Sequence, residues 1–259
     1  NDRDGRVNFA LDASLMESGT INVHPLHNEA TTAISTHDLL RFVELTGHRA
    51  VIVDFDRLEA LAAELPGPAR AVACDISDGE SVAKAAAEVG DVDGFVFLAG
   101  VYWPTKSADW DPDQVEAMID INLTGGAHVL GRIVPRFAAE DRGHVVIIGS
   151  LSGFRGLPGA IGYGASKSGL MHLAEDIHAD LHRTNVKVQL VNPGFIKSRL
   201  TDKNPFHMPF IMEAEEAAEQ VVAAMRSKRF QTNFPRVFSW LFRGANFLPA
   251  CLYYRIFGT

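Results

Sequence analysis

The chain has 259 residues, of which 47% are hydrophobic and 22% charged, a composition that excludes a disordered protein and allows a sizeable buried core. A formal net charge of −8, with the charges interspersed, argues against a nucleic-acid partner. Two cysteines, Cys74 and Cys251, are too few for a disulfide framework, so we expect a reducing, cytoplasmic setting. We expect neither a signal peptide nor a membrane-spanning segment, and the ten histidines show no metal-ligand spacing, so no metal is expected.

Short apolar runs alternate with helical patterns from about residue 48 onward. The predicted strands cover residues 50–54, 71–75, 94–98, 144–148 and 187–191. The predicted helices cover residues 57–65, 78–89, 111–140, 163–183 and 213–227. Because the strands are apolar throughout, they are expected to be buried on both faces. The pattern predicts an α/β fold with a Rossmann-type, doubly wound parallel sheet in a three-layer α/β/α arrangement, forming one domain over residues 1–259.

The N-terminal segment 1–46 is atypical because two apolar runs compete as its first strand. Residues 7–11 are followed by Asp12, Ala13 and Ser14 in a turn. Residues 21–26 are the alternative, although Pro25 is unfavourable inside a strand. A helix over residues 36–45 fits either alternative, and the sequence leaves both open.

Tyr163 and Lys167 lie four residues apart at the start of a predicted helix, so their side chains share one face and can touch. A tyrosine is a poor base at its ordinary pKa of about 10. A neighbouring ammonium favours the phenolate and should lower the pKa of Tyr163, which makes the pair a candidate acid/base unit. The same spacing also occurs where a core tyrosine lies beside a solvated lysine. The surrounding sequence is therefore needed to distinguish an active site from ordinary packing.

Two further polar residues supply that context. Ser150 follows the apolar strand 144–148, and a glycine-rich loop leads from it to Tyr163. Asn122 lies inside a predicted helix, where asparagine is unfavourable and needs a partner for its amide. In order and spacing, Asn122, Ser150, Tyr163 and Lys167 match the catalytic tetrad of the short-chain dehydrogenase/reductase family, which the chain resembles from about residue 47 to its end.

The resemblance implies an NAD(P)-dependent oxidoreductase that interconverts an alcohol and a ketone by hydride transfer. Tyr163 would donate or accept the proton, and Ser150 would donate a hydrogen bond to the substrate carbonyl. Lys167 would hold the nicotinamide ribose and lower the tyrosine pKa, and Asn122 would hold a water that relays protons. The family also implies a homodimer or homotetramer, formed through the helices over 111–140 and 163–183.

Asp54, at the end of a predicted strand, matches the family's acidic ribose-binding residue, which favours NAD over NADP. An aspartate after a strand can also be a simple cap. The resemblance assigns the remaining cofactor contacts to Asp75, Ile76, Ala99, Gly100, Tyr163, Lys167, Pro193, Gly194, Ile196 and Ser198. The expected cofactor is therefore NAD.

The phosphate-binding turn of the family, Thr-Gly-x-x-x-Gly-x-Gly, is missing from the first 50 residues. Counted back from Gly47, its glycine positions hold Ala30, Ile34 and Thr36, whose side chains would crowd the phosphates. This departure supports an alternative hypothesis, a non-catalytic relative that keeps the fold as a scaffold or binding protein and has lost dinucleotide binding.

Residues 199–212 lie where the family carries its substrate lid, and their aromatic and aliphatic side chains predict a small apolar alcohol or ketone as substrate. Tyr102 and Trp103 are expected in the same pocket. The apolar C-terminal segment 234–259 is expected to cover the core or contact another subunit; a helical pair that touches a membrane surface is the less favoured alternative.

Overall fold

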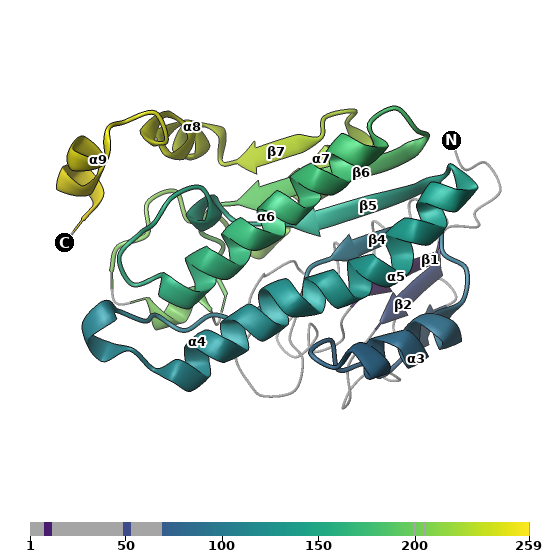
Figure 1. Cartoon of the computed structure of the whole chain (residues 1–259). Coiled ribbons are helices and arrows are strands. Elements are labelled where there is room, and N and C mark those ends of the chain that lie inside the picture. Colours follow the sequence, from purple (N-terminus) through teal and green to yellow (C-terminus); the bar gives the residue numbers. More distant parts are fainter. Residues whose placement is uncertain (1–7, 12–48, 53–68, 199, 205, 259) are drawn as a thin grey trace.

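The computed structural model describes residues 8–11, 49–52, 69–198, 200–204 and 206–258 (Figure 1). Its strands are β1 (Asn8–Leu11), β2 (Arg49–Ile52), β3 (Ala69–Ala71), β4 (Gly94–Phe97), β5 (Gly143–Ile148), β6 (Val186–Pro193) and β7 (Gln231–Phe234). Its helices are α3 (Gly79–Val89), α4 (Pro112–Ile119), α5 (Gly125–Glu140), α6 (Ile161–Leu181), α7 (Ala214–Arg226), α8 (Arg236–Ala245) and α9 (Ala250–Phe257). Short helical turns are η2 (Ser107–Asp109), η3 (Asp120–Thr124), η4 (Leu151–Gly153) and η5 (Thr201–Lys203).

The strands are parallel in every pair that forms a ladder. One ladder runs β1–β2–β3 and the other β4–β5–β6–β7, and β1 lies beside β4. The spatial order is therefore β3-β2-β1-β4-β5-β6-β7, which reverses direction between β1 and β4. In doubly wound sheets this reversal opens a crevice at the carboxyl ends of the two strands, and ligands bind there.

Helices cover both faces of the sheet, which confirms the predicted three-layer arrangement. Figure 1 shows α3, α5 and α6 side by side across one face, and contacts between neighbouring helices agree. On β6, Gln189 hydrogen-bonds to α7, whereas its neighbour Leu190 lies beside Met171 of α6. Successive strand residues point to opposite faces, so α6 and α7 lie on opposite sides of β6. The core residues Val145–Ile148 of β5 are fully buried between the layers.

The structure differs from the sequence prediction mainly at the sheet margins. Of the two candidate first strands, residues 8–11 form β1, while the alternative at 21–26 lies outside the described residues, as does the predicted helix at 57–65. The strand expected at 71–75 is instead at Ala69–Ala71, because Asp75 already belongs to a turn in which its carboxylate accepts hydrogen bonds from Ser77. Strand β7 was not predicted, because its polar sequence Gln-Thr-Asn-Phe lacks an apolar run.

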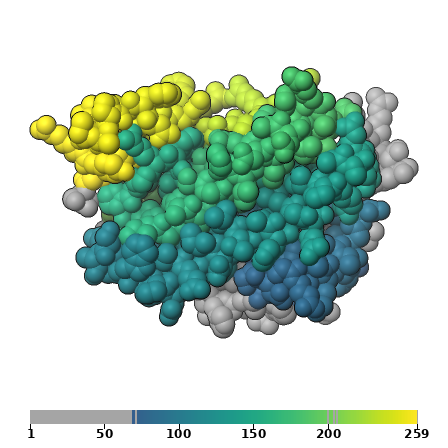
Figure 2. Space-filling model, viewed as in Figure 1, coloured from purple at the N-terminus to yellow at the C-terminus, as the bar shows by residue number. Residues whose placement is uncertain are grey.

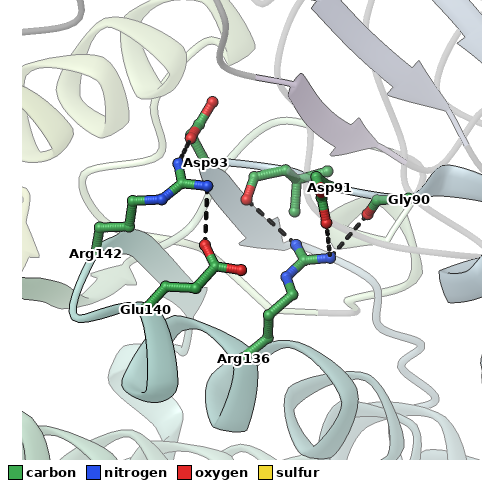
Figure 3. Close-up of polar contacts among 7 residues, drawn as sticks. Gly90, Asp91, Asp93, Arg136, Glu140 and Arg142 are labelled. Atoms are coloured by element: carbon green, nitrogen blue, oxygen red, sulfur yellow. Dashed lines mark hydrogen bonds and ion pairs between the residues drawn. The ribbon is translucent and has the colours of Figure 1, made fainter.

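Two arginines of α5 and the following turn fix the start of β4. The Arg136 guanidinium donates to the carbonyl oxygens of Gly90 and Val92 at 2.8 and 3.2 Å. Arg142 forms ion pairs with Asp93 and Glu140 (Figure 3). Because these contacts hold the residues that lead into β4, they also fix the register of the strand whose other end reaches the site.

Helices α8 and α9 follow β7 and form the C-terminal end of the molecule (Figure 1). The C-terminal segment thus forms two helices. Among the described helices, none combines the length and apolarity needed to cross a bilayer.

Candidate active site

Tyr163 and Lys167 lie one turn apart near the start of α6, with the Lys167 Nζ atom 5.9 Å from the centre of the Tyr163 ring. Lys167 is fully buried, and its ammonium donates to the carbonyl oxygen of Ile148 at 3.0 Å. Burial lowers the pKa of Lys167 to about 8, because a low-dielectric surrounding disfavours the charged form. The ammonium is thus held under the end of β5, directly before Ser150.

Burial raises the pKa of Tyr163 to about 12, and a hydrogen bond with Ser150 opposes this rise. The lowering expected from Lys167 was therefore wrong for this arrangement. The physical reason is that desolvation of the phenolate exceeds the help from an ammonium that is itself desolvated and already donates to Ile148. The phenol is consequently protonated at neutral pH.

Ser150 caps the turn η4, two residues after the end of β5, and is almost fully buried. Its Oγ atom accepts the backbone N–H of Ser152 at 3.2 Å and lies 2.7 Å from the Ser152 hydroxyl. These bonds hold the Ser150 hydroxyl beside Tyr163, on the wall of the same pocket. Sequence reasoning did not single out Ser152, although it is part of this hydrogen-bonded unit.

Asn122 lies in the π-helical turn η3 between α4 and α5 and has no exposed surface. Its Oδ1 atom accepts the N–H of Val101 at 2.6 Å, and its Nδ2 atom donates to the Val101 carbonyl at 2.9 Å and to the Ser166 hydroxyl at 3.0 Å. The side chain therefore ties the end of β4 to α6. A π turn inside a helix is rare and is found frequently at functional sites.

Gly100 lets these groups approach one another. A Cβ atom at this position would lie 3.1 Å from Asn122 Oδ1 and 3.3 Å from Lys167 Nζ. Both distances are shorter than most contacts that Cβ atoms make in proteins. The absence of a side chain at Gly100 thus keeps space open next to the buried ammonium, at the carboxyl end of β4 and beside the reversal of strand order.

The pocket in front of Tyr163 is open on one side and is lined mainly by apolar groups. The structure brings the following predicted site residues to its wall: Ser150, Tyr163, Pro193, Gly194, Ile196 and Ser198. Tyr102 also lines it, as expected. Its ring meets Tyr163 edge-on at 5.1 Å, and its hydroxyl donates to the side-chain oxygen of Asn204 at 2.8 Å. Trp103 packs instead on the small core cluster that contains Met118.

Other predicted cofactor residues lie apart from this pocket. Ile76 and Ala99 line a separate cavity between α3, β4 and α5. The Asp75 carboxylate is engaged by Ser77, with its Oδ1 atom 2.6 Å from the Ser77 hydroxyl. Asp54 and the expected phosphate-binding turn lie outside the described residues.

Phe238 and Phe242 of α8 also line the pocket, and sequence reasoning missed them. Phe238 contacts Phe195 and Phe210, with ring centres 5.7 and 5.5 Å away. The one available signal was a pair of phenylalanines four residues apart, which indicates a shared helix face but not what that face contacts.

Comparison with known protein families agrees with this geometry. Residues 41–208 match the family model described as short chain dehydrogenase. The chain belongs to this family. Its members are oxidoreductases, so the first of the two functional hypotheses is supported at the level of the family.

Two curated relatives and one solved structure illustrate the likeness. A Myxococcus xanthus protein named as an uncharacterized oxidoreductase is 38% identical over 167 residues, which cover 64% of this chain and 66% of the relative, just under two thirds of its length. Human epidermal retinol dehydrogenase 2 is 29% identical over 190 residues, covering 69% of this chain and 61% of the relative. A short-chain dehydrogenase from Sphingobium yanoikuyae, solved in complex with NADPH, superposes with a TM-score of 0.75 at 22% identity, covering 92% of this chain and 93% of that one. At that identity the superposition establishes the fold.

Among the described residues, no group of three or more His, Cys, Asp or Glu side chains is placed to hold a metal ion. The homodimer or homotetramer expected from the family resemblance remains a prediction.

Proposed function

We propose that this short-chain dehydrogenase is an NAD(H)-dependent oxidoreductase that interconverts an apolar ketone and the corresponding alcohol, with Tyr163 as the acid/base. The observation that carries the proposal is the placement of Ser150 and Tyr163 together on one pocket wall, with the buried ammonium of Lys167 behind them. A carbonyl oxygen between two hydroxyl donors is polarised toward addition at its carbon.

Each polar group has a separate role in this proposal. Ser150 donates a hydrogen bond to the substrate oxygen, and Tyr163, protonated at neutral pH, transfers its proton to that oxygen during reduction. Asn122 contributes by position, because both of its amide protons already go to Val101 and Ser166. A relay water at this residue would therefore have to donate a hydrogen bond to an oxygen atom of Asn122, because no amide proton remains for it.

The described part of the site fits the reactive end of a nicotinamide dinucleotide. Among the described residues, the Lys167 ammonium has the Ile148 carbonyl as its hydrogen-bond acceptor, so N–H groups remain for ribose hydroxyls. Gly100 leaves the adjacent space open, since a Cβ there would crowd both Asn122 and Lys167. When bound, the nicotinamide supplies or accepts the hydride. Our preference for NAD over NADP rests on Asp54, whose carboxylate would repel a 2′-phosphate.

The pocket lining supports an apolar substrate. Aromatic rings from three separate segments surround the two hydroxyls: Tyr102, Phe195, Phe206, Phe238 and Phe242. Such a surface binds hydrocarbon groups because water is excluded from it. Few other polar groups on the wall would compete with Ser150 and Tyr163 for hydrogen bonds to the substrate carbonyl. The human relative is named for retinol, an apolar alcohol, which is consistent with this choice.

The direct test is reduction of 2-decanone by NADH with the variant Tyr163→Phe. We expect kcat to fall by roughly 10²- to 10⁴-fold, because the variant keeps the ring but loses the transferable proton. Tyr254→Phe, which changes an exposed tyrosine of α9, serves as the matched control and should keep wild-type kcat. Equal unfolding temperatures would show that the loss is chemical. Wild-type turnover by Tyr163→Phe would rule out this proton donor.

A further inference from the structure

Helices α8 and α9 present an unusual concentration of apolar surface. Phe247, which lies between the two helices, is 90% exposed, and Trp240 and Val237 of α8 are 65% and 63% exposed. Four further large apolar side chains of these helices are exposed: Leu241, Leu252, Tyr254 and Ile256. Of the other exposed large apolar residues in the described part of the chain, three belong to the adjoining segment 206–211, and only Trp110 lies elsewhere. Figure 2 shows the C-terminal segment as a yellow projection at one end of the molecule. We call these seven residues the C-terminal face.

The C-terminal face is separate from the surface that these helices use for folding. Phe238, Ala245 and Tyr253 are buried against the body of the protein. Trp240 and Leu241, by contrast, lie three and four residues after Val237, and the three side chains form an outward stripe. These three exposed side chains of α8 thus make little contribution to the core.

Arg155 holds the two helices in a fixed position. Its Nη1 atom donates to the carbonyl oxygens of Ala245 and Leu248, both at 2.8 Å, and its guanidinium stacks 4.0 Å from the centre of the Tyr253 ring. The Tyr253 hydroxyl donates to the carbonyl of Gly156 at 3.0 Å. The C-terminal face is therefore preformed on the loop that leads from Ser150 to Tyr163.

The charge of the C-terminal segment helps to distinguish a membrane surface from a second copy of the chain as the partner of this face. The segment 234–258 contains three exposed arginines, Arg236, Arg243 and Arg255, and no acidic residue, although the whole chain carries a net charge of −8. Within the described part of the chain, none of the ion pairs involves these arginines. A symmetric contact between two copies of this face would place six arginines and no acidic residue of the segment in one interface, which is electrostatically unfavourable.

We propose that the C-terminal face docks onto the surface of a bilayer containing anionic phospholipids. Exposed Trp, Tyr and Phe side chains favour the boundary between headgroups and acyl chains, and arginines beside them attract anionic headgroups. Because α8 also supplies Phe238 and Phe242 to the pocket, docking places the pocket next to the lipid. This last consequence, delivery of an apolar substrate from the bilayer, rests on the proposed function; the docking itself does not.

The test is flotation of the full chain with phosphatidylcholine vesicles, with and without phosphatidylglycerol. We expect the chain to float with the anionic vesicles and to float less with phosphatidylcholine alone or in high salt. The variant Val237→Ser/Trp240→Ser/Phe247→Ser should lose flotation with both kinds of vesicle. Arg236→Gln/Arg243→Gln/Arg255→Gln should lose the preference for the anionic ones. Trp110→Ser removes an exposed tryptophan outside the face and should float like the wild type.

A second measurement does not depend on the stability of the serine variant. The chain has three tryptophans, so Trp103→Phe/Trp110→Phe leaves Trp240 as the single emitter. Its fluorescence should shift to the blue when anionic vesicles are added and should be quenched by brominated lipid. Failure of the wild type to float, or an unshifted Trp240 emission, would overturn docking. Docking would also be overturned if light scattering showed that the triple serine variant converts a dimer into monomers while the wild type does not bind vesicles. The C-terminal face would then be a contact between two copies of the chain. None of these measurements uses NADH or turnover, so they test the docking proposal independently of the proposed catalytic function.

Discussion

Single side chains in this protein show how burial decides the behaviour of an ionisable group. Lys167 keeps a hydrogen bond to Ile148 yet has its pKa lowered to about 8, and Tyr163, one helical turn away, has its pKa raised to about 12. The spacing of the two residues in the sequence predicts their proximity, but the cost of desolvating each charge depends on what packs around them. We therefore expect the phenol to act as a proton donor before it can act as a base.

His144 of β5 gives a prediction for the pH dependence of stability. Its Nε2 atom lies 2.8 Å from the Oε1 atom of Gln189, and burial lowers its pKa from 6.5 to about 4. Between these two pH values the unfolded chain binds the proton and the folded chain does not. The free energy of unfolding should therefore decrease as pH falls from 6.5 to 4, by at most about 3 kcal/mol from this group.

Urea unfolding of the wild type and of His144→Gln at several pH values checks this expectation. The variant keeps an amide that can donate to Gln189 but has no titrating ring, so the stability of the wild type relative to the variant should decline below pH 6.5. Parallel curves for the two proteins down to pH 4 would show that the histidine has an ordinary pKa.

Whole elements differ in how strongly their sequence specifies their position. The helix predicted over 111–140 is present as α4, η3 and α5, beginning with Asp111, whose carboxylate caps the N–H of Gln114 at 3.1 Å. The π turn that interrupts it was not predicted, because it depends on Asn122 reaching Val101 on another element. Similarly, the C-terminal segment was expected to cover the core or contact another subunit, but the position of α8 on the wall of the pocket was not predicted.

Arg155 is expected to control the attachment of this C-terminal pair. Arg155→Ala removes charged hydrogen bonds to Ala245 and Leu248 and the stacking on Tyr253. We expect residues 236–257 to exchange their amide hydrogens faster, by roughly thirty-fold, which corresponds to about 2 kcal/mol. Hydrogen-exchange mass spectrometry should show no change in α6.

The control for this experiment is Arg132→Ala, an exposed arginine on α5. It should leave exchange of the C-terminal helices unchanged. Equal protection of α8 and α9 in Arg155→Ala and wild type would mean that apolar packing of Phe238 and Tyr253 alone holds the pair.

At the scale of the whole molecule, the order of the strands brings distant segments to one place. The carboxyl ends of β4, β5 and β6 supply Gly100, Ser150 and Pro193, respectively, and α6 adds Tyr163 and Lys167 behind them. Parallel strands end at the same edge of a sheet, so residues about 50 and 40 positions apart can act on one bound molecule.

Cofactor binding tests the molecule as a unit. If the proposed site is functional, NADH at about 100 times its Kd stabilises the fold by about 2.7 kcal/mol and raises the melting temperature by roughly 5–10 °C. We expect NADPH to give a smaller shift, and Asp54→Ala to remove the difference between them. Asp113→Ala, an exposed acid on α4, is the control.

Two outcomes would contradict this prediction in different ways. A larger shift with NADPH would show that Asp54 does not select the ribose. No shift with either nucleotide at millimolar concentration would favour the scaffold hypothesis, which the missing glycine turn suggested.

By itself, the sequence determined the fold class, because strand and helix periodicity are local. It also identified four candidate residues, Asn122, Ser150, Tyr163 and Lys167, because the motif lies largely on one helix and the strand before it. The sequence could not distinguish between the two candidate first strands, because strand pairing depends on residues far apart in the chain. Only the tertiary structure decided which groups share a pocket, how burial shifts the pKa values of Tyr163 and Lys167, and which apolar side chains of α8 and α9 are exposed. These features depend on contacts between segments far apart in the chain, and hydrophobic contact is non-directional, so no local pattern encodes its partner.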